Sequence, residues 1–205
     1  MNIERFADWG RVGSLPPGSR VVGSDRELAL VLSESRRTGG ERPTVGLVGG
    51  DMWRTLGAPT GGEKRLRGGR ATLMEVDAVE VIPDGGPPMV FVAHLVARRP
   101  LYRGRIVAVM NAEWHGEFDV TPRSHPSDGR VELLDADLPA GQKWKARGRL
   151  RTGTHTPHPD IAVRSAASHE VVFERRFGLW LDGTRIGDVH RVEVRVLPEA
   201  LTVVV

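Results

Sequence analysis

The feature that most limits the possible folds of this chain is a pair of short apolar strands. Each strand is followed by a glycine–aspartate turn and then by a helical segment. The strands are SRVV at 19–22 and PTVGLV at 43–48, and residues 25–39 between them have the apolar face and terminal arginines of a helix. Parallel strands joined in this way form a βαβ unit. Helix N-termini that follow glycine turns often bind phosphate through backbone N–H groups. The stretch predicts a nucleotide-type site, working or vestigial.

The chain changes character after Arg70. The segments that follow alternate or run in β-branched residues, and turns such as DGGPP and SDG separate them, at 71–82, 88–99, 104–114, 129–138, 169–177 and 191–205. One helix is expected at 138–153, and residues 58–70 are interpreted as a loop. The predicted fold class is α+β: a truncated βαβ nucleotide-domain portion at 1–65, then an antiparallel, β-sandwich-like domain at 66–205.

Composition limits the compartment and the partners that can be expected for this chain. The chain has 205 residues and no cysteine, which excludes disulfides and cysteine-bound zinc and fits a reducing compartment. Its net charge of +3 is small, so nucleic acid is not an expected partner. The longest apolar stretch, MVFVAHLVA, is too short to span a bilayer, and the N-terminal residues have no apolar signal core. We expect a cytoplasmic protein that associates with a membrane at most peripherally.

Five stretches, in order, resemble motifs of the diacylglycerol kinases and related bacterial lipid kinases, a family similar to sphingosine kinases and NAD kinases. VVGSDRE lies where that family has G-G-D-G-T, and VGLVGGDMWRTLGAP where it has G-T-G-N-D-F-A-R-x-L-G. The other three are VMNAEWHGEFDVTPRSHPSDGRVELLDAD, GTHTPHPDI, and LWLDGTRIG with the closing strand. The resemblance runs from about Val21 to the C-terminus. It implies a nucleotide-binding portion followed by a β-rich portion.

The resemblance also implies where a nucleotide and its metal would lie. The positions that match the family's nucleotide site are Gly23, Asp25, Gly49, Gly50, Asp51 and Asn111. In such kinases glycine loops let backbone N–H groups approach phosphate, and an aspartate organises Mg²⁺. The aspartate before the family's acceptor base corresponds to Asp182, which is the candidate catalytic residue if the chain is active.

Several positions depart from the family's pattern. In the first loop Ser24 and Arg26 replace glycines and Glu27 replaces a threonine, which crowds the loop and adds negative charge. In the second, Val48 replaces a threonine and Gly50 an asparagine. Thr184 stands where the family has the glutamate implicated as the base, and a threonine cannot accept that proton at neutral pH.

The length of the nucleotide-type portion also departs from the family's pattern. The family has further β-α units ahead of its first glycine loop, whereas here that loop begins at Val21. We therefore expect a non-catalytic, lipid-kinase-like protein that binds a ligand, lipid or protein, with no cofactor. The alternative is an ATP- and Mg²⁺-dependent lipid kinase with reassigned site residues. A third interpretation is a homodimer subunit, because a shortened sheet needs other cover for its edges and faces.

Metal-site alternatives are weaker. Asp128 lies in a loop that can hold a structural divalent ion in the family, although Ser127 removes one oxygen ligand and a plain turn explains Asp-Gly as well. His155 and His158, with His115, His125 or Asp160, would offer zinc ligands. Glu113, His115 and Glu117 would share one face of a strand, where a solvated face is the simpler interpretation.

Basic residues gather in QKWKARGRLR beside Trp144. The cations are Lys143, Lys145, Arg147, Arg149 and Arg151. They would line one face of a strand but spread around a helix. A basic face with a tryptophan suits an anionic lipid surface, and an exposed arginine-rich helix explains the pattern equally well. The sequence does not decide which ligand binds.

Overall fold

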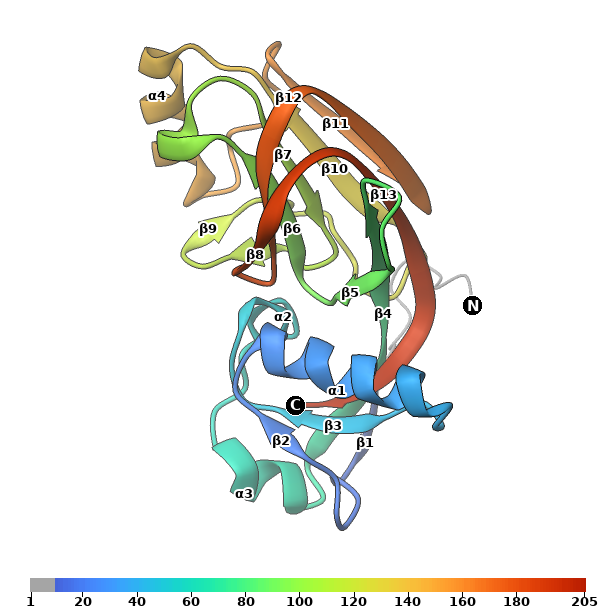
Figure 1. The fold of residues 1–205 in the computed structure, drawn as a ribbon. Helices are drawn as coiled ribbons and strands as arrows, with labels where there is room; N and C mark the ends of the chain where they lie inside the picture. Colours follow the sequence, from blue (N-terminus) through green and yellow to red (C-terminus); the bar gives the residue numbers. More distant parts are fainter. Residues whose placement is uncertain (1–9) are drawn as a thin grey trace.

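The computed structural model describes residues 10–205, and its main element is one sheet of 11 strands (Figure 1). The main path has the strand order β1-β4-β13-β12-β6-β7-β10-β11, while β3 joins β13, β2 joins β3 and β5 joins β4. The strands are β1 (Gly10–Gly13), β2 (Val21–Val22), β3 (Thr44–Leu47), β4 (Ala71–Pro83), β5 (Met89–Phe91), β6 (His94–Arg98), β7 (Ile106–Met110), β10 (Val131–Ala136), β11 (Ile161–Ala166), β12 (Ser168–Leu181) and β13 (Thr184–Val204).

The remaining elements are a small hairpin and short helices. The hairpin pairs β8 (Trp114–His115) with β9 (Phe118–Asp119). The helices are α1 (Asp25–Thr38), α2 (Asp51–Thr55), α3 (Gly62–Arg67), the 3₁₀ turn η1 (Pro100–Tyr102) and α4 (Ala140–Leu150). Within the described residues, no helix has the length and apolar character that a membrane-spanning helix requires.

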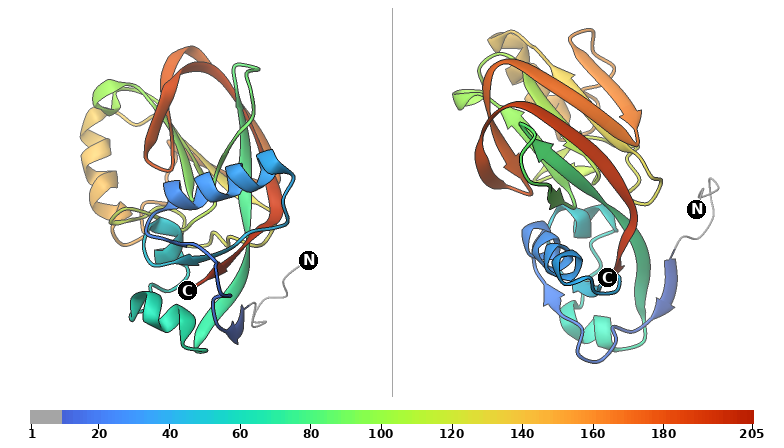
Figure 2. Two further views of the ribbon diagram at one scale, coloured as in Figure 1. Left: turned by 60° about the horizontal axis from the view of Figure 1, so that its bottom comes forward. Right: turned by 45° about the vertical axis from the view of Figure 1, so that its right-hand side comes forward.

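Two long strands connect the helix-rich end of the molecule with its β-rich end. In Figures 1 and 2 the helices α1, α2 and α3 gather with β1–β3 at one end, and β6–β12 with α4 form the other. The long strands β4 and β13 pair along most of their length and run through both ends. A bulge between Leu197 and Leu201 of β13 bends this ribbon where the two ends meet.

The predicted βαβ unit is confirmed. β2 and β3 are parallel, with Val21 opposite Gly46, and α1 connects them. The helix begins at its N-cap Ser24 and ends at Gly39, whose φ of 65° is the left-handed conformation typical of a helix C-cap. β3 also pairs in parallel with the end of β13, so the C-terminal strand completes the sheet of this unit.

The prediction of a loop at 58–70 is wrong, because α3 forms within it. Leu66 of α3 is buried against Leu15, Leu73 and Val204. α1 instead packs on a cluster that contains Val203 and Val205. Since neighbouring residues of a strand point to opposite faces, α1 and α3 cover opposite faces of the sheet. The segment has only one buried apolar side chain among glycines and charges, so periodicity gave no helical signal.

The β-rich prediction holds with one interruption. The antiparallel strands β4, β7, β10, β12 and β13 fall on predicted segments, and α4 falls on the predicted helix. The segment 88–99 was expected as one strand but breaks at Val92–Ala93 into β5 and β6. One core cluster includes Val79 of β4 and Val131 of β10, although four strands separate them in the sheet. The sheet therefore curls on itself around this core.

Candidate functional site

The two glycine–aspartate turns of the βαβ unit touch each other. A Cβ atom added to Gly49 would lie 2.5 Å from the carbonyl oxygen of Gly23, and one added to Gly50 would lie 2.6 Å from Asp25 Oδ1. Both are closer than real Cβ contacts allow, so glycine is required at both positions. The sequence prediction that these residues form one site is supported by this contact, although no ligand tests the role.

Asp25 connects the turns through its carboxylate. Oδ2 accepts a hydrogen bond from the Asp51 N–H at 2.6 Å, and Oδ1 accepts one from the Met52 N–H at 2.9 Å. Asp25 therefore caps the N-terminus of α2 from a distant part of the sequence. Burial, the largest effect, and the charges of Asp182 and Asp51 raise the pKa of Asp25 to about 6, against these two hydrogen bonds.

The first turn closes on itself in a variant of the capping box. The Ser24 hydroxyl accepts a hydrogen bond from the Glu27 N–H at 3.3 Å, and the Glu27 carboxylate accepts one from the Gly23 N–H at 2.8 Å. In the usual capping box the glutamate accepts from the N–H of the N-cap residue, whereas here it reaches one residue further back. Glu27 thus supplies the anion at the N-terminus of α1, and the side chain of Arg26 is exposed beside it.

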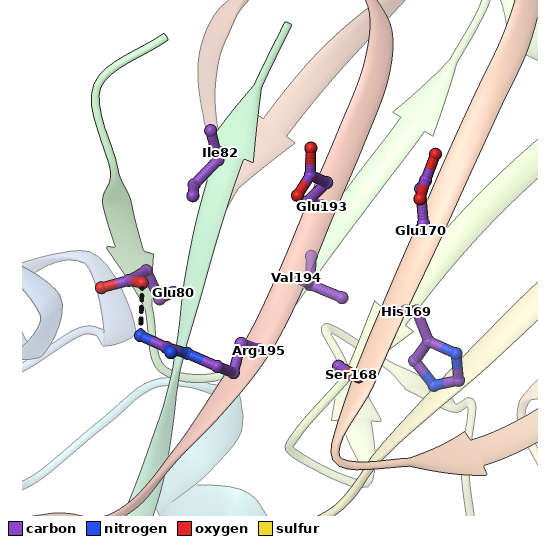
Figure 3. A pocket seen from close by; sticks show the side chains of 8 residues that line it. All are labelled: Glu80, Ile82, Ser168, His169, Glu170, Glu193, Val194 and Arg195. Atoms are coloured by element: carbon purple, nitrogen blue, oxygen red, sulfur yellow. Dashed lines mark hydrogen bonds and ion pairs between the residues drawn. The ribbon is translucent and has the colours of Figure 1, made fainter. Parts of the chain in front are cut away.

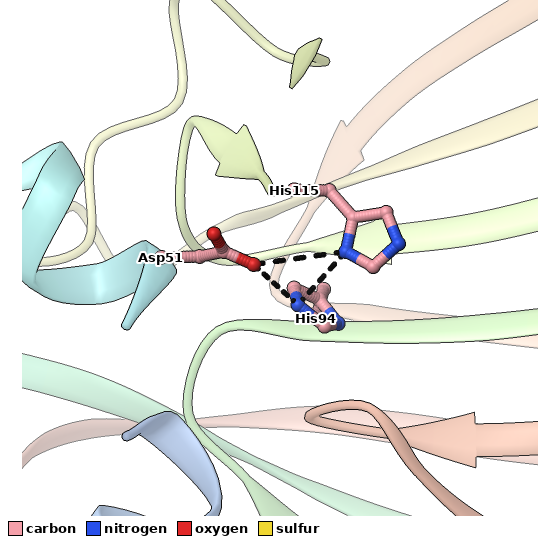
Figure 4. Close-up of side chains that lie close together, drawn as sticks. All are labelled: Asp51, His94 and His115. Carbon is pink, nitrogen blue, oxygen red and sulfur yellow. Dashed lines mark hydrogen bonds and ion pairs between the residues drawn. The ribbon is translucent and has the colours of Figure 1, made fainter. Parts of the chain in front are cut away.

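The second turn leads to a cluster of one carboxylate and two imidazoles (Figure 4). Asp51 Oδ2 lies 2.9 Å from His94 Nε2, and His94 Nε2 lies 3.0 Å from His115 Nδ1. Asp51 Oδ1 accepts a hydrogen bond from the Gly116 N–H at 2.8 Å. Among the described residues this is the one group of three histidine or acidic side chains whose ligand atoms converge.

The charges around this cluster stabilise positive charge at His94 and negative charge at Asp51. Burial alone would raise the pKa of Asp51, but hydrogen bonds from His115 and His94 hold it well below its usual range. Burial alone would lower the pKa of His94, yet the hydrogen bond to Asp51 and the charges of Asp182, Asp51 and Asp25 raise it. The local field therefore attracts positive charge.

The carboxylate of Asp182, the candidate catalytic residue from the sequence, accepts hydrogen bonds from the backbone. Its carboxylate accepts hydrogen bonds from three consecutive N–H groups, those of Val92 at 2.9 Å, Ala93 at 2.9 Å and His94 at 3.0 Å. These bonds explain the break between β5 and β6, because the N–H groups turn from the sheet toward Asp182. Burial raises the pKa of this carboxyl, with the charge of His94 and the N–H groups opposing. Asp182 thereby positions His94.

Asn111 and Asp128 have local structural contacts. Asn111 is fully buried, and its Nδ2 donates to the carbonyl oxygens of Asp77 at 3.0 Å and Val92 at 2.7 Å. It braces the segment that carries His94, and its role in a nucleotide site stays a prediction. Asp128 Oδ1 accepts a hydrogen bond from the Arg130 N–H at 2.9 Å, as in a side-chain-supported turn. A metal role for Asp128 stays a prediction.

The alternative ligand sets of the sequence do not come together. His155 is buried, and burial lowers its pKa despite a contact with the backbone of Val120. His158 Nδ1 accepts a hydrogen bond from the Asp160 N–H at 3.1 Å, within its own turn. The Glu117 carboxylate forms an ion pair of 3.1 Å with Arg151. Of the alternating residues Glu113, His115 and Glu117, only His115 reaches Asp51. The hairpin turn at Gly116 separates these side chains.

The basic segment forms the helix α4, and alternate residues of a helix do not share one face as they would on a strand. Lys143 Nζ donates to the carbonyl oxygens of Tyr102 at 2.5 Å and Gly104 at 2.6 Å, which holds α4 against the η1 loop. Arg149 is exposed. The side chains of Ala140, Trp144, Lys145 and Arg147 lie outside the described part of the structure.

A shallow hollow of about 410 Å³ lies elsewhere, on β4, β12 and β13 (Figure 3). Glu80 and Arg195 form an ion pair of 3.0 Å at one side of it, and His169 and Glu170 line the other. The hollow is open, with mixed polar and apolar walls, and lies outside the Asp51–His94–His115 cluster. The converging side chains, rather than the hollow, mark the candidate site.

Sequence reasoning missed His94 altogether. The residue lies inside MVFVAHLVA, which was interpreted as part of a strand and as an apolar stretch too short to span a bilayer. A histidine in a buried strand is a weak signal, but the family-type aspartates Asp51 and Asp182 both contact it. His115 was named as part of an alternating face and as a possible zinc ligand beside His155 and His158. Neither histidine has a sequence spacing that links it to Asp51.

The fold joins a βαβ portion, with its two touching turns, to a curled antiparallel sheet. No family model matches the chain, and neither does any curated protein sequence. Solved structures do match. "A putative diacylglycerol kinase from Bacillus anthracis str. Sterne" has a TM-score of 0.63 and 16% identity, over 89% of this chain and 76% of that one.

Two further structures from Bacillus anthracis str. Sterne agree. A "putative diacylglycerol kinase" has a TM-score of 0.62 and 17% identity, over 79% of this chain and 68% of that one. A structure described as a diacylglycerol kinase has a TM-score of 0.58 and 16% identity, over 79% and 66%. At this identity the likeness establishes the fold, and the resemblance stated from sequence is confirmed at that level.

Proposed function

We propose that this chain is a lipid-kinase-like protein that binds a ligand, lipid or protein without catalysing phosphoryl transfer. The observation that carries the proposal is the hydrogen bond of 2.8 Å between the Gly23 N–H and the Glu27 carboxylate. In a phosphate-binding turn that N–H group would face the phosphate. Here an internal anion takes its place, and its charge opposes a second anion.

Asp25 supports the same proposal. Both of its carboxylate oxygens accept backbone hydrogen bonds from α2, so an ion bound there would compete with the helix cap. Gly50 has no side chain that could contact a nucleotide. Asp25 lies so close to Gly50 in space that a side chain would not fit at position 50. These residues do not fit Mg²⁺ and ATP well, and we derive no chemical step through them. A nucleotide-type α/β portion at 1–65 and a β-rich portion at 66–205 remain parts of this proposal.

The alternative is an ATP-dependent lipid kinase with reassigned residues. Its base would be Asp182, which already accepts three backbone hydrogen bonds. Phosphoryl transfer to diacylglycerol by the purified chain, lost in Asp182→Asn, would favour this alternative. Because Asp182 also holds the backbone of His94, that experiment needs a check that the variant is folded.

Wild-type protein is expected to show no binding of ATP or Mg·ATP at ligand concentrations up to about 1 mM, where only about 4 kcal/mol of affinity is needed. Calorimetric titration with and without Mg²⁺ is the measurement. The matched variant carries Arg26→Gly and Glu27→Thr, which restore the family's residues in the first turn. A micromolar isotherm for the wild type contradicts the proposal, whereas binding gained only by the variant identifies Glu27 and Arg26 as the block.

An anionic lipid surface is the ligand that the basic helix α4 suits, and each engaged cation adds about 1 kcal/mol at low salt. We expect flotation with anionic but not zwitterionic vesicles, weakened when Lys145, Arg147 and Arg149 become alanine. Lys143 is left unchanged because it holds the η1 loop. Screening should remove the association at 1 M salt, where the Debye length is about 3 Å. Equal flotation of wild type and variant would count against a role for α4.

A homodimer also remains a prediction, on different grounds from those of the sequence. α1 and α3 cover both faces of the parallel strands, so uncovered faces no longer argue for it. β1 pairs only with β4, and its Val12 is 78% exposed. An unpaired strand edge with an exposed apolar side chain favours pairing with a second copy. A monomer mass by light scattering across a wide concentration range would exclude it.

A further inference from the structure

Three side chains from separate parts of the chain point at one position. Asp51 lies at the start of α2, His94 at the start of β6 and His115 at the end of β8 (Figure 4). The atoms that converge are Asp51 Oδ2, His94 Nε2 and His115 Nδ1. Their separations are 2.9 Å from oxygen to His94, 3.0 Å between the two nitrogens and 3.7 Å from oxygen to His115.

A proton serves these contacts less well than a metal cation does. A single N–H on His94 Nε2 can be shared between Asp51 and His115 only as a bent, three-centre hydrogen bond. A proton shared between the two rings leaves the Asp51 oxygen without a donor, and protons on both nitrogens would face each other at 3.0 Å. One cation between the atoms accepts a lone pair from all three at once.

The triangle has the size of a metal site. Zinc binds imidazole nitrogen and carboxylate oxygen at about 2.0–2.2 Å, which places neighbouring tetrahedral ligands roughly 3.3 Å apart. The observed separations of 2.9, 3.0 and 3.7 Å bracket that value. Only small side-chain movements are needed to receive an ion.

Neighbouring groups hold the three side chains in place. Asp51 Oδ1 accepts the Gly116 N–H, while the backbone N–H groups of Asp51 and His94 donate to Asp25 and Asp182. The guanidinium of Arg54 lies 3.7 Å from the Trp114 ring centroid and donates to the Gly116 carbonyl oxygen, which fixes the hairpin that carries His115. Such supporting contacts orient the ligands of known metal sites.

The surroundings of His94 favour a cation. Coordination through Nε2 would place the ring proton on Nδ1, which is buried and has no hydrogen-bond partner among the described residues, so the ion must offset that unsatisfied donor. The carboxylates of Asp25 and Asp182 lie close enough to influence His94 and make the surroundings negative. The His94 side chain is 4% exposed and that of His115 41%, so the site is closed on one side and open on the other.

We propose that Asp51, His94 and His115 bind a Zn²⁺-type divalent ion and leave a coordination position open toward solvent. Two imidazole nitrogens and one carboxylate oxygen suit zinc and related transition metals, whereas Mg²⁺ takes oxygen ligands. Three protein ligands with an open position are the arrangement of zinc sites that bind water or an exogenous ligand. The site is independent of nucleotide binding and goes beyond the function proposed above.

The test is calorimetric titration of chelator-treated full-length chain with ZnCl₂ in the absence of nucleotide. We expect one ion per chain, with affinity reduced in His115→Ala by more than the about 10–100-fold that loss of a supporting contact costs. His115 is partly exposed, so the variant should fold. His190→Ala, which removes an exposed histidine on β13, is the matched control and should bind as the wild type does.

Two further readouts need no variant. Co²⁺ should give the visible absorption of a low-coordinate nitrogen–oxygen site, and excess Mg²⁺ should not displace it. Histidine ring resonances of two residues should shift on zinc addition. Equal zinc affinity of wild type and His115→Ala, absence of one-to-one binding, or displacement of Zn²⁺ by Mg²⁺ would each overturn the proposal. Because no nucleotide is used, its failure is distinct from micromolar binding of Mg·ATP, which would contradict the proposed function.

Discussion

Replacement of Asp182 by alanine is expected to lower the free energy of unfolding by about 3 kcal/mol or more. The carboxylate accepts three consecutive N–H groups, from residues that are buried or nearly so. Each buried donor left without a partner costs about 1–3 kcal/mol. The N–H groups of Val92, Ala93 and His94 all donate to Asp182 rather than to a neighbouring strand, at the break between β5 and β6.

Asp84 offers a matched control for this prediction. It also has a positive φ, 48° against 44° for Asp182, and accepts two backbone N–H groups, from His190 and Arg191. Asp84 is exposed, so water replaces its carboxylate and Asp84→Ala should cost about 1 kcal/mol or less. Urea denaturation of both variants measures the difference. Equal destabilisation would show that the three hydrogen bonds of Asp182 contribute no more than an exposed turn does.

Gly50→Ala is expected to be the second large effect, about 3–5 kcal/mol of lost stability. Gly50 has φ 100° and ψ 175°, a region open to glycine alone, where another residue costs about 1–3 kcal/mol. Its Cβ would also lie 2.6 Å from Asp25 Oδ1. Displacement of Asp25 would uncap α2 at Asp51 and Met52, at about 1–3 kcal/mol for each lost buried bond.

Gly57 separates the two causes. Its φ is 94°, close to that of Gly50, but an added Cβ meets nothing within 4 Å. Gly57→Ala should therefore cost only the backbone strain, about 1–3 kcal/mol. Chemical denaturation of both variants gives the contribution of the contact with Asp25 by subtraction. If the two variants are equally destabilised, the packing of the two turns contributes little.

The close contact between Gly50 and Asp25 also limits any restoration of the family's nucleotide-site residues. Restoring the family's asparagine by Gly50→Asn would place a side chain against Asp25. The substitution at this position is thus coupled to the way the turns pack, and one residue cannot be restored by itself. The sequence comparison identified the missing amide but not this obstacle, because the contact joins residues 25 positions apart in the chain.

Local patterns allowed much of the fold to be predicted. The βαβ unit followed from the apolar strands and from Ser24 and Gly39 at the ends of α1. The antiparallel strands followed from alternation, which depends only on neighbouring residues. The capping box was also readable as S-x-x-E in SDRE, although Glu27 was interpreted only as a lost threonine. Its role follows from residues three apart on a helix.

The sequence by itself determined the elements and the family-type turns, because these depend on short-range periodicity and on glycine. Only the tertiary structure decided what the turns do. Asp25 caps α2 and Asp182 breaks a strand because distant backbone N–H groups lack partners of their own. Likewise, His94 and His115 lie against Asp51 because the fold brings the starts of α2 and β6 and the end of β8 together, and no spacing along the chain encodes that meeting.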